Sequence, residues 1–450
     1  MIHLALVASV WASPLAVDVS VHQLPNGLTV VLSENHRTDT IALHLRYGVG
    51  SKDERPGERG SAHLFEHLMF EGSRNAPGNA FDEWLTAAGG DDNAFTSEDE
   101  TAYTMTFPSG ALDLALFLES DRMGFLGDGL TEQNLANQKA VVLAERARRY
   151  DQPNGRDSDA LVVLQFPEGH PYHHPVIGTV ADVQGLDLDG VRDFWGRHYR
   201  PRNAVLGMVG HFDTEEALAR IEHWFSDVPD RGPAEVLPPA GEAWRVASER
   251  GVASDGLLVD EVEERTLYLS WPTVPIGHPD EQALELLSWV LSAGRGTRLD
   301  DRLYYGSDLA SDCNAWSFPG VVDGHFVVYA STSSVRLERL ARVIGRVLAS
   351  VGSRPPSAEE LDRARGALRG SRLDRLEEPE DLVEMLVDCQ FLHGDAACLE
   401  DRWARYEAVT TEDLVRVART WLRPERRVSL SVVSEGDRGG MSGAVPVELP

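Results

Sequence analysis

The sequence predicts an α+β protein built from two homologous domains, each a mostly antiparallel sheet with helices packed on one face. Strand patterns alternate with helical patterns in an order that suits helices packed on a sheet. This order occurs twice in the 450 residues, at an offset of about 223 residues. A stretch rich in proline, glycine and acidic residues separates the two copies and is typical of a linker.

The duplication is visible in corresponding strands and in the helices that follow them. The alternating segment IALHLRY at 41–47 corresponds to RTLYLSW at 265–271. TAYTMTF, which ends at Phe107, precedes an amphipathic helical pattern, and so does HFVVYAS, which ends at Ser331. Near the end of each copy, a helical pattern leads through an Arg-Pro pair into a strand. We therefore expect two domains of common ancestry rather than three unrelated ones.

The two copies and the segments around them give the expected domain boundaries. We assign 1–17 to a signal or disordered N-terminus, 18–228 to the first domain, 229–246 to the linker, 247–436 to the second domain and 437–450 to a C-terminal tail. The N-terminal run MIHLALVASVWASPLA resembles the apolar part of a secretory signal, although no Lys or Arg precedes it. It favours a periplasmic or secreted protein, and a frayed segment of a cytoplasmic protein is the alternative.

Charge and cysteine content exclude several classes of partner and site. The 72 acidic and 42 basic residues give a formal net charge of −30, which argues against nucleic-acid partners. The same charge, and the shortness of the N-terminal apolar run, argue against binding to or insertion into a membrane. Cys313, Cys389 and Cys398 are too few for a disulfide scaffold or a thiolate metal site, and we expect them to be small buried hydrophobic residues.

The first copy contains a metal-binding pattern in GSAHLFEHLMFEGS. His63 and His67 are four residues apart, so on a helix they share one face and can reach one metal ion. Glu66 lies between them, where it can take a proton from a water molecule at the metal, as in the inverted zincin motif. A catalytic zinc usually has three protein ligands, and the best third candidate is Glu145, at the end of a mostly apolar helical stripe.

The alternative is a chance motif whose histidines pack in a core, and the second copy is an internal control for it. The residues that correspond to His63, Glu66, His67 and Glu145 are Leu286, Trp289, Val290 and Leu368. Because burying four polar residues without partners would cost several kcal/mol, packing alone does not explain the first copy. A rival cluster in GHPYHHP, with His170, His173 and His174, contains prolines and lacks a nearby base, so we interpret it as a polar loop.

The chain resembles the pitrilysin/insulinase family of zinc peptidases, which includes the β-subunit of mitochondrial processing peptidase. Its layout is similar to the short bacterial two-domain members. The resemblance runs through LPNGLTVVLSENHRT, YGVGSKDERPGERGSAHLFEHLMFEGS, NAFTSEDETAY, LESDRM, ERARRYDQPNG, GHPYHHPVIGT, YRPRNAVLGMVGHFD, LSWPTVPIGHPDE and LRPERRVSLSVV. It implies one zinc ion per chain, held by His63, His67 and Glu145, with Glu66 as the general base.

The resemblance also implies a substrate-binding strand. Asn93, Ala94, Phe95 and Thr96 match the family segment that pairs with the backbone of a bound peptide as an added edge strand. Family members often carry a second glutamate seven residues before the third ligand, and here that position is Gln138. A supporting charge near the metal is therefore expected to be absent.

A second departure from the family pattern lies in the second domain. The family has an Arg and a Tyr there that help to hold the substrate, and in register these positions fall on Tyr304 and Ser311. The resemblance thus implies a zinc endopeptidase that acts on peptides or unfolded polypeptides as one half of a heterodimer, with a homologous chain supplying Arg and Tyr. The alternatives are a non-catalytic peptide-binding or assembly subunit and a lyase family that shares the inverted motif, whose chains are far too short.

Overall fold

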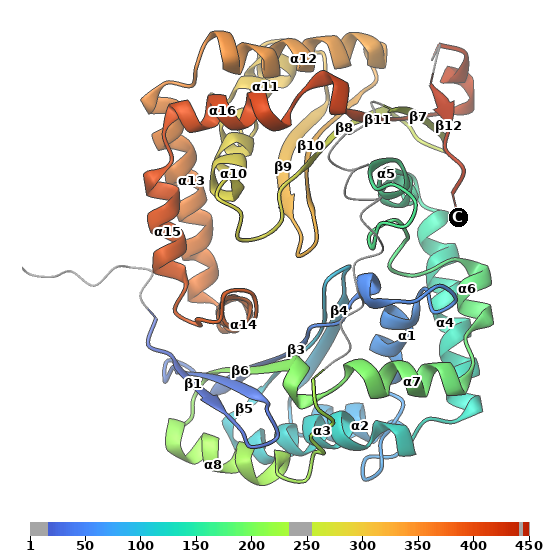
Figure 1. The fold of residues 1–450 in the computed structure, drawn as a ribbon, viewed down its shortest axis with the longest axis vertical. Helices are drawn as coiled ribbons and strands as arrows, with labels where there is room; N and C mark the ends of the chain where they lie inside the picture. Colours follow the sequence, from blue (N-terminus) through green and yellow to red (C-terminus); the bar gives the residue numbers. More distant parts are fainter. Residues whose placement is uncertain (1–16, 234–253, 441–443, 450) are drawn as a thin grey trace, which may run out of the picture.

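Two six-stranded sheets form the framework of the computed structural model, which describes residues 17–233, 254–440 and 444–449 (Figure 1). Most of the expected N-terminal segment and most of the expected linker lie outside the described residues. The first sheet contains β1 (Ser20–Gln23), β2 (Thr29–Glu34), β3 (Thr40–Tyr47), β4 (Asp91–Thr96), β5 (Thr101–Pro108) and β6 (Ala204–Gly210). The second contains β7 (Ser254–Val259), β8 (Arg265–Thr273), β9 (Asp312–Pro319), β10 (Gly324–Thr332), β11 (Val428–Val433) and β12 (Val445–Pro446).

Helices connect the strands in both halves of the chain. Those of the first half are α1 (Ser61–Leu68), α2 (Ala80–Ala87), α3 (Leu112–Phe125), α4 (Glu132–Tyr150), α5 (Asp157–Gln165), α6 (Val180–Gly185), α7 (Leu188–His198) and α8 (Thr214–Phe225). Those of the second half are α10 (Glu281–Leu291), α11 (Arg298–Asp300), α12 (Leu337–Ser353), α13 (Ala358–Glu377), α14 (Pro379–His393), α15 (Leu399–Ala408) and α16 (Thr411–Trp421). None of the helices in the described ranges is long and apolar enough to cross a bilayer.

The two sheets have corresponding strand orders, which confirms the predicted α+β duplication. The orders are β1-β2-β6-β3-β5-β4 and β12-β7-β11-β8-β10-β9, so β4 and β9 are the corresponding edge strands. In the first sheet every neighbouring pair is antiparallel except β2 and β6. In the second sheet β7 pairs in parallel with β11 and β12, and the other pairs are antiparallel. The main core of each half lies between its sheet and its own helices.

Each sheet is also covered on its other face by one helix from the opposite half, and the sequence did not predict this exchange. Helix α14 packs on β3 and β6 of the first sheet, and α5 packs on β7, β8 and β11 of the second. The approach is close at both contacts, since a Cβ atom at Gly207 would collide with Val387 and one at Gly256 would collide with Leu164. Figure 1 shows both helices between the two sheets, so the exchange joins the halves.

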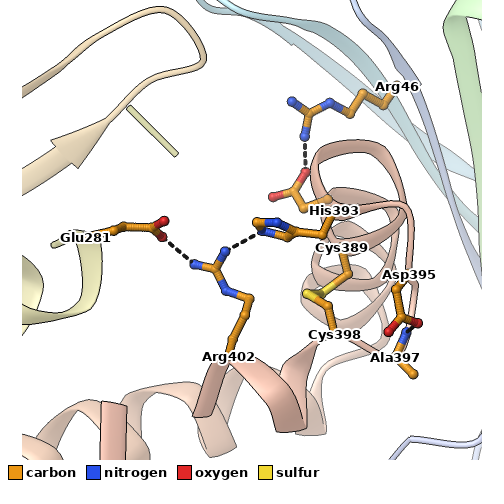
Figure 2. Close-up of a disulfide and its surroundings, with 9 residues drawn as sticks. Arg46, Glu281, Cys389, His393, Asp395, Ala397, Cys398 and Arg402 are labelled. Carbon is orange, nitrogen blue, oxygen red and sulfur yellow. Dashed lines mark hydrogen bonds and ion pairs between the residues drawn. A yellow bond between two sulfur atoms is a disulfide. The ribbon is translucent and has the colours of Figure 1, made fainter. Parts of the chain in front are cut away.

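The prediction that all three cysteines are merely small buried residues was wrong, because Cys389 and Cys398 form a disulfide (Figure 2). Helix α14 ends at His393, and the C-cap residue Gly394, with φ of 71°, reverses the chain. This reversal returns Cys398, at the start of α15, to the last turns of α14, and the two Cα atoms lie 5.5 Å apart. Cys313 is the remaining cysteine and is buried without a disulfide.

Removing this disulfide is expected to destabilise the protein moderately. The bridge closes a loop of roughly ten residues, so its loss should lower the free energy of unfolding by about 2–3 kcal/mol. Urea unfolding of the wild type and of a Cys389→Ala/Cys398→Ala variant would measure the difference. Dithiothreitol should shift the wild type towards the variant and leave the variant unaffected. Equal stability of the two proteins in oxidising buffer would contradict the prediction.

Candidate metal centre

Helix α1 carries the inverted motif, and a carboxylate from the preceding loop binds its first turn. Gly60 precedes the helix in the left-handed conformation, with φ of 84°, and cannot cap it with a side chain. The buried carboxylate of Glu54 accepts the backbone N–H groups of Gly60 at 2.9 Å and Ala62 at 2.8 Å. Two donors at the start of the helix are thereby satisfied. The sequence carries no signal for this role of Glu54, because capping residues usually lie next to the helix.

His63 and His67 project from α1 towards Glu145 on α4. The Nε2 atom of His63 lies 3.7 Å from Oε1 of Glu145, and Nε2 of His67 lies 3.4 Å from Oε2. One ligand atom from each of the three residues can be chosen so that all lie within 4.8 Å of one another. Among the described residues they are the only group of three or more His, Cys, Asp or Glu side chains that could hold a metal ion.

The chemistry of this donor set fits zinc. Two imidazole nitrogens and one carboxylate oxygen are the protein ligands of a common type of catalytic zinc site, which keeps a fourth position open. All three side chains are partly buried, so solvent and a substrate can reach the group. Burial lowers the pKa of His63 to about 4, with His67 adding to the decrease and Glu145 opposing it. The imidazole is therefore neutral near pH 7, which is the form that binds metals.

The second half has an apolar core at the corresponding place. Leu286 and Val290 on α10 and Leu368 on α13 are fully buried members of the second hydrophobic core, and Trp289 packs against it. The same pair of helices is thus held together by apolar packing in one half and brings polar ligands together in the other. This contrast supports a functional role for the polar group in the first half.

Glu66 lies beside the three candidate ligands and contacts the expected substrate strand. Its Oε2 atom accepts a hydrogen bond of 2.6 Å from the hydroxyl of Thr96, at the end of β4. Burial raises the pKa of Glu66, while the Thr96 hydrogen bond and His67 partly oppose that increase. A carboxylate in this position, with a raised pKa, is suited to accept and return a proton.

Strand β4 is an edge of the first sheet and hydrogen-bonds to β5 on one side only. Exposure alternates along it, with Asn93 and Phe95 exposed and Ala94 and Thr96 partly buried. Its other edge therefore offers backbone N–H and C=O groups that could pair with an extended peptide. The structure brings this edge next to Glu66 through the Thr96 contact.

Gln138 lies on α4, seven residues before Glu145, and contacts Glu71, which lies outside the His63–His67 motif. Its side-chain amide donates a hydrogen bond to the carboxylate of Glu71, which follows α1. The resemblance implies a glutamate at position 138 in many family members. Here the residue is Gln138, and it binds the carboxylate of Glu71. The sequence offered no signal for Glu71, because the turn after α1 determines where its side chain lies.

The GHPYHHP loop contacts the second half of the chain through Tyr172 and His170, and within the described ranges none of its histidines joins a group that could hold a metal. The Tyr172 hydroxyl donates to Asp99 at 2.7 Å and accepts the backbone N–H of Val322 at 2.9 Å. His170 lies 3.7 Å from Asp323 in the same β9–β10 turn. The loop therefore ties the end of β4 to the tip of the second-half hairpin.

Tyr304 and Ser311 occupy the two positions where the resemblance implies an Arg and a Tyr. Tyr304 is exposed in the π-helical turn Asp301–Tyr305. The Ser311 hydroxyl donates to Glu264. Position 304 therefore carries a phenol where the resemblance implies a guanidinium, and position 311 carries a small hydroxyl where it implies a phenol.

Replacing Glu54 should loosen the helix that carries the motif. In Glu54→Ala, two buried N–H groups lose their acceptor, so the free energy of unfolding should fall by about 1–3 kcal/mol. Zinc should also be removed more readily by a chelator, because the first turn of α1 carries His63. Urea unfolding and zinc competition would measure both effects. Glu54→Gln, which keeps a carbonyl acceptor, is the matched control and should lose less. A Glu54→Ala chain that retained wild-type stability and zinc affinity would contradict this role.

Two family models match successive parts of the chain. The family model for insulinase (peptidase family M16) matches residues 29–164, and the model for the peptidase M16 inactive domain matches residues 185–368. A zinc protease of Helicobacter pylori, PqqE, is 27% identical over 407 residues, which cover 89% of each chain. An uncharacterized zinc protease of Streptomyces coelicolor is 26% identical over 413 residues, covering 91% of this chain and 88% of that protein.

Solved structures share the fold. A protease from Helicobacter pylori superimposes with a TM-score of 0.83 at 24% identity and covers 93% of this chain and 100% of its own. A structure from Pseudomonas fluorescens, described as a peptidase M16 inactive domain, has a TM-score of 0.82 at 22% identity and covers 96% and 100%. The similarity spans both halves of the chain, so the two-domain architecture is common to these proteins.

Proposed function

Because the chain belongs to the insulinase family (peptidase family M16), we propose that it is a zinc-dependent endopeptidase that hydrolyses peptides or unfolded polypeptides. The observation that carries the proposal is the convergence of His63, His67 and Glu145 beside Glu66, at the end of an edge strand. The zinc proteases among the relatives of this chain support the choice of metal.

In this proposal the residues of the chain divide the work between binding and proton transfer. His63, His67 and Glu145 would hold a zinc ion, which would act as a Lewis acid towards the peptide carbonyl and towards water. Glu66 takes the proton from the attacking water and returns it to the leaving amine. Thr96 holds the Glu66 carboxylate by its hydrogen bond. The free edge of β4, from Asn93 to Thr96, holds the peptide extended, so that one bond is positioned before the reaction.

We also propose that the active form is a heterodimer with a homologous chain of the same family. Tyr304 and Ser311 stand where the family has the Arg and Tyr that help to hold the substrate. A second subunit would supply these two groups opposite the zinc-bearing half.

A peptide-digest assay with the purified full-length chain tests both proposals. The zinc-loaded chain should cleave unfolded peptides, a chelator should abolish cleavage, and zinc should restore it. Addition of the homologous chain should increase the rate. Full activity of the single chain, unaffected by the homologue, would reject the heterodimer. Zinc and peptide binding without turnover in either condition would identify the alternative, a non-catalytic peptide-binding subunit.

Export to an oxidising compartment is the location we propose. The Cys389–Cys398 bridge supports it, because disulfides are rare in the cytosol. Thiol trapping in intact source cells, followed by denaturation, should label Cys313 alone. Labelling of all three cysteines would indicate a reducing compartment.

A further inference from the structure

Exposed large apolar side chains lie near the ends of the two edge strands, β4 and β9. Phe95 on β4 is 38% exposed, and Trp316 and Phe318 on β9 are 37% and 45% exposed. Val321, in the turn after β9, is also exposed. In a monomeric protein such side chains are usually scattered, and a group of them indicates a binding surface.

Trp316 and Phe318 lie on the inner face of the second sheet. Directly paired residues share a face, and the register pairs Asn314 with Tyr329 and Tyr329 with Tyr268. Tyr268 packs against the cluster formed with α5, so this is the face that α5 covers. Since side chains alternate along a strand, Trp316 and Phe318 point to the same side as Asn314.

Phe95 lies on the corresponding face of the first sheet. It is paired with Ala102, and Ala102 with Arg46. The Arg46 guanidinium lies 4.7 Å from the ring of Phe391 on α14, so Phe95 is on the face that α14 covers. Figure 1 shows α5 and α14 between the two sheets, which means that both inner faces look into the same region.

The apolar surface adjoins the candidate metal centre. The backbone N–H of Val321 donates to Asp99 at 2.9 Å, so the tip of the β9–β10 hairpin touches the turn that follows β4. Thr96, the last residue of β4, donates to Glu66. The end of β4 therefore lies near the tip of this hairpin, and Phe318 is exposed at the end of β9 that leads into the same tip.

Neighbouring rings support these side chains and leave them open to solvent. The ring of Trp316 lies 6.2 Å from that of Phe318 and 6.1 Å from that of Tyr329. The ring of Phe318 lies 5.1 Å from that of His325. Such packing orders the rings before a ligand arrives, which reduces the entropy lost on binding.

We propose that Trp316 and Phe318 form a specificity surface that binds a large apolar side chain of the peptide held along β4. The inference rests on the proposed function and adds to it the class of substrate. Burial of apolar area against preordered aromatic rings provides the selectivity. Unfolded polypeptides expose such side chains and folded ones mostly do not, so the surface also favours unfolded substrates.

Peptide binding to the zinc-loaded full-length Glu66→Gln variant tests this without depending on turnover. Two series of fluorescent peptides are compared. In one series Leu is placed at each position of the peptide in turn, and in the other series Ser is placed there. The Leu series should bind about tenfold more tightly at one position, and the Trp316→Ser/Phe318→Ser variant in the same background should reduce this ratio to near one. Trp84→Ser, at a tryptophan on α2 that is 40% exposed, is the matched control and should keep the ratio.

The outcomes separate this inference from the proposed function. Equal binding of both series, or an unchanged ratio in the double variant, overturns the inference even if the wild type is active. A clear ratio with a wild type that cleaves nothing supports the inference and rejects the peptidase. The Trp316→Ser/Phe318→Ser variant could also lose its association with the homologous chain in sedimentation while its Leu-to-Ser binding ratio stays unchanged. That result would show that the surface is a subunit interface and would overturn the inference.

Discussion

Glu66→Gln is expected to reduce peptide hydrolysis by about two to four orders of magnitude while the chain still binds zinc. The amide has nearly the shape of the carboxylate and can still accept the Thr96 hydroxyl through its oxygen. It cannot take a proton from water at neutral pH, however, so the variant separates chemistry from metal binding. Steady-state rates on a peptide digest, together with the zinc content of the same sample, would measure both.

An exposed glutamate provides the control for this prediction. Glu132, in the first turn of α4, is exposed and lies on the same helix as Glu145. Glu132→Gln removes the same charge from the protein and should keep the wild-type rate. Turnover by Glu66→Gln at more than a tenth of the wild-type rate would mean that another group acts as the base.

The candidate histidine pair could be predicted from the sequence because its geometry is local. The spacing of His63 and His67 places both on one helical face, whatever packs around them. Glu145 was found from a helical stripe, and the duplicated half showed that its counterpart, Leu368, is apolar. The structure places these three side chains within reach of one metal ion.

Contacts that depend on the path of a loop or on the packing of the two halves could not be predicted in the same way. The pattern of each half predicted helices on a sheet, but the exchange of α5 and α14 depends on how the halves fold over one another. The Cys389–Cys398 bridge depends on the reversal at Gly394, which a cysteine count does not contain. Glu54 reaches α1 through a loop, so no capping pattern identified it.

Loss of one ligand should eliminate the metal site. His67→Ala leaves His63 and Glu145, and two ligands rarely hold zinc against dilution. The zinc content after gel filtration should therefore fall from about one ion per chain to almost none, and hydrolysis should be lost with it. The fold should persist, because the corresponding position in the second half is the apolar Val290 and that half packs without a metal. Metal analysis and circular dichroism would measure the two effects.

The rival histidine cluster supplies the matched control for this experiment. His173 lies in the GHPYHHP loop, and its ring contacts the backbone oxygen of Phe166 rather than any group that could share a metal. His173→Ala should therefore keep its zinc and its hydrolytic activity. If His173→Ala lost zinc while His67→Ala retained it, the metal would lie in the loop and the proposed centre would be wrong. If both single variants retained their zinc, neither site would be the metal centre, because each variant removes one candidate ligand from its site.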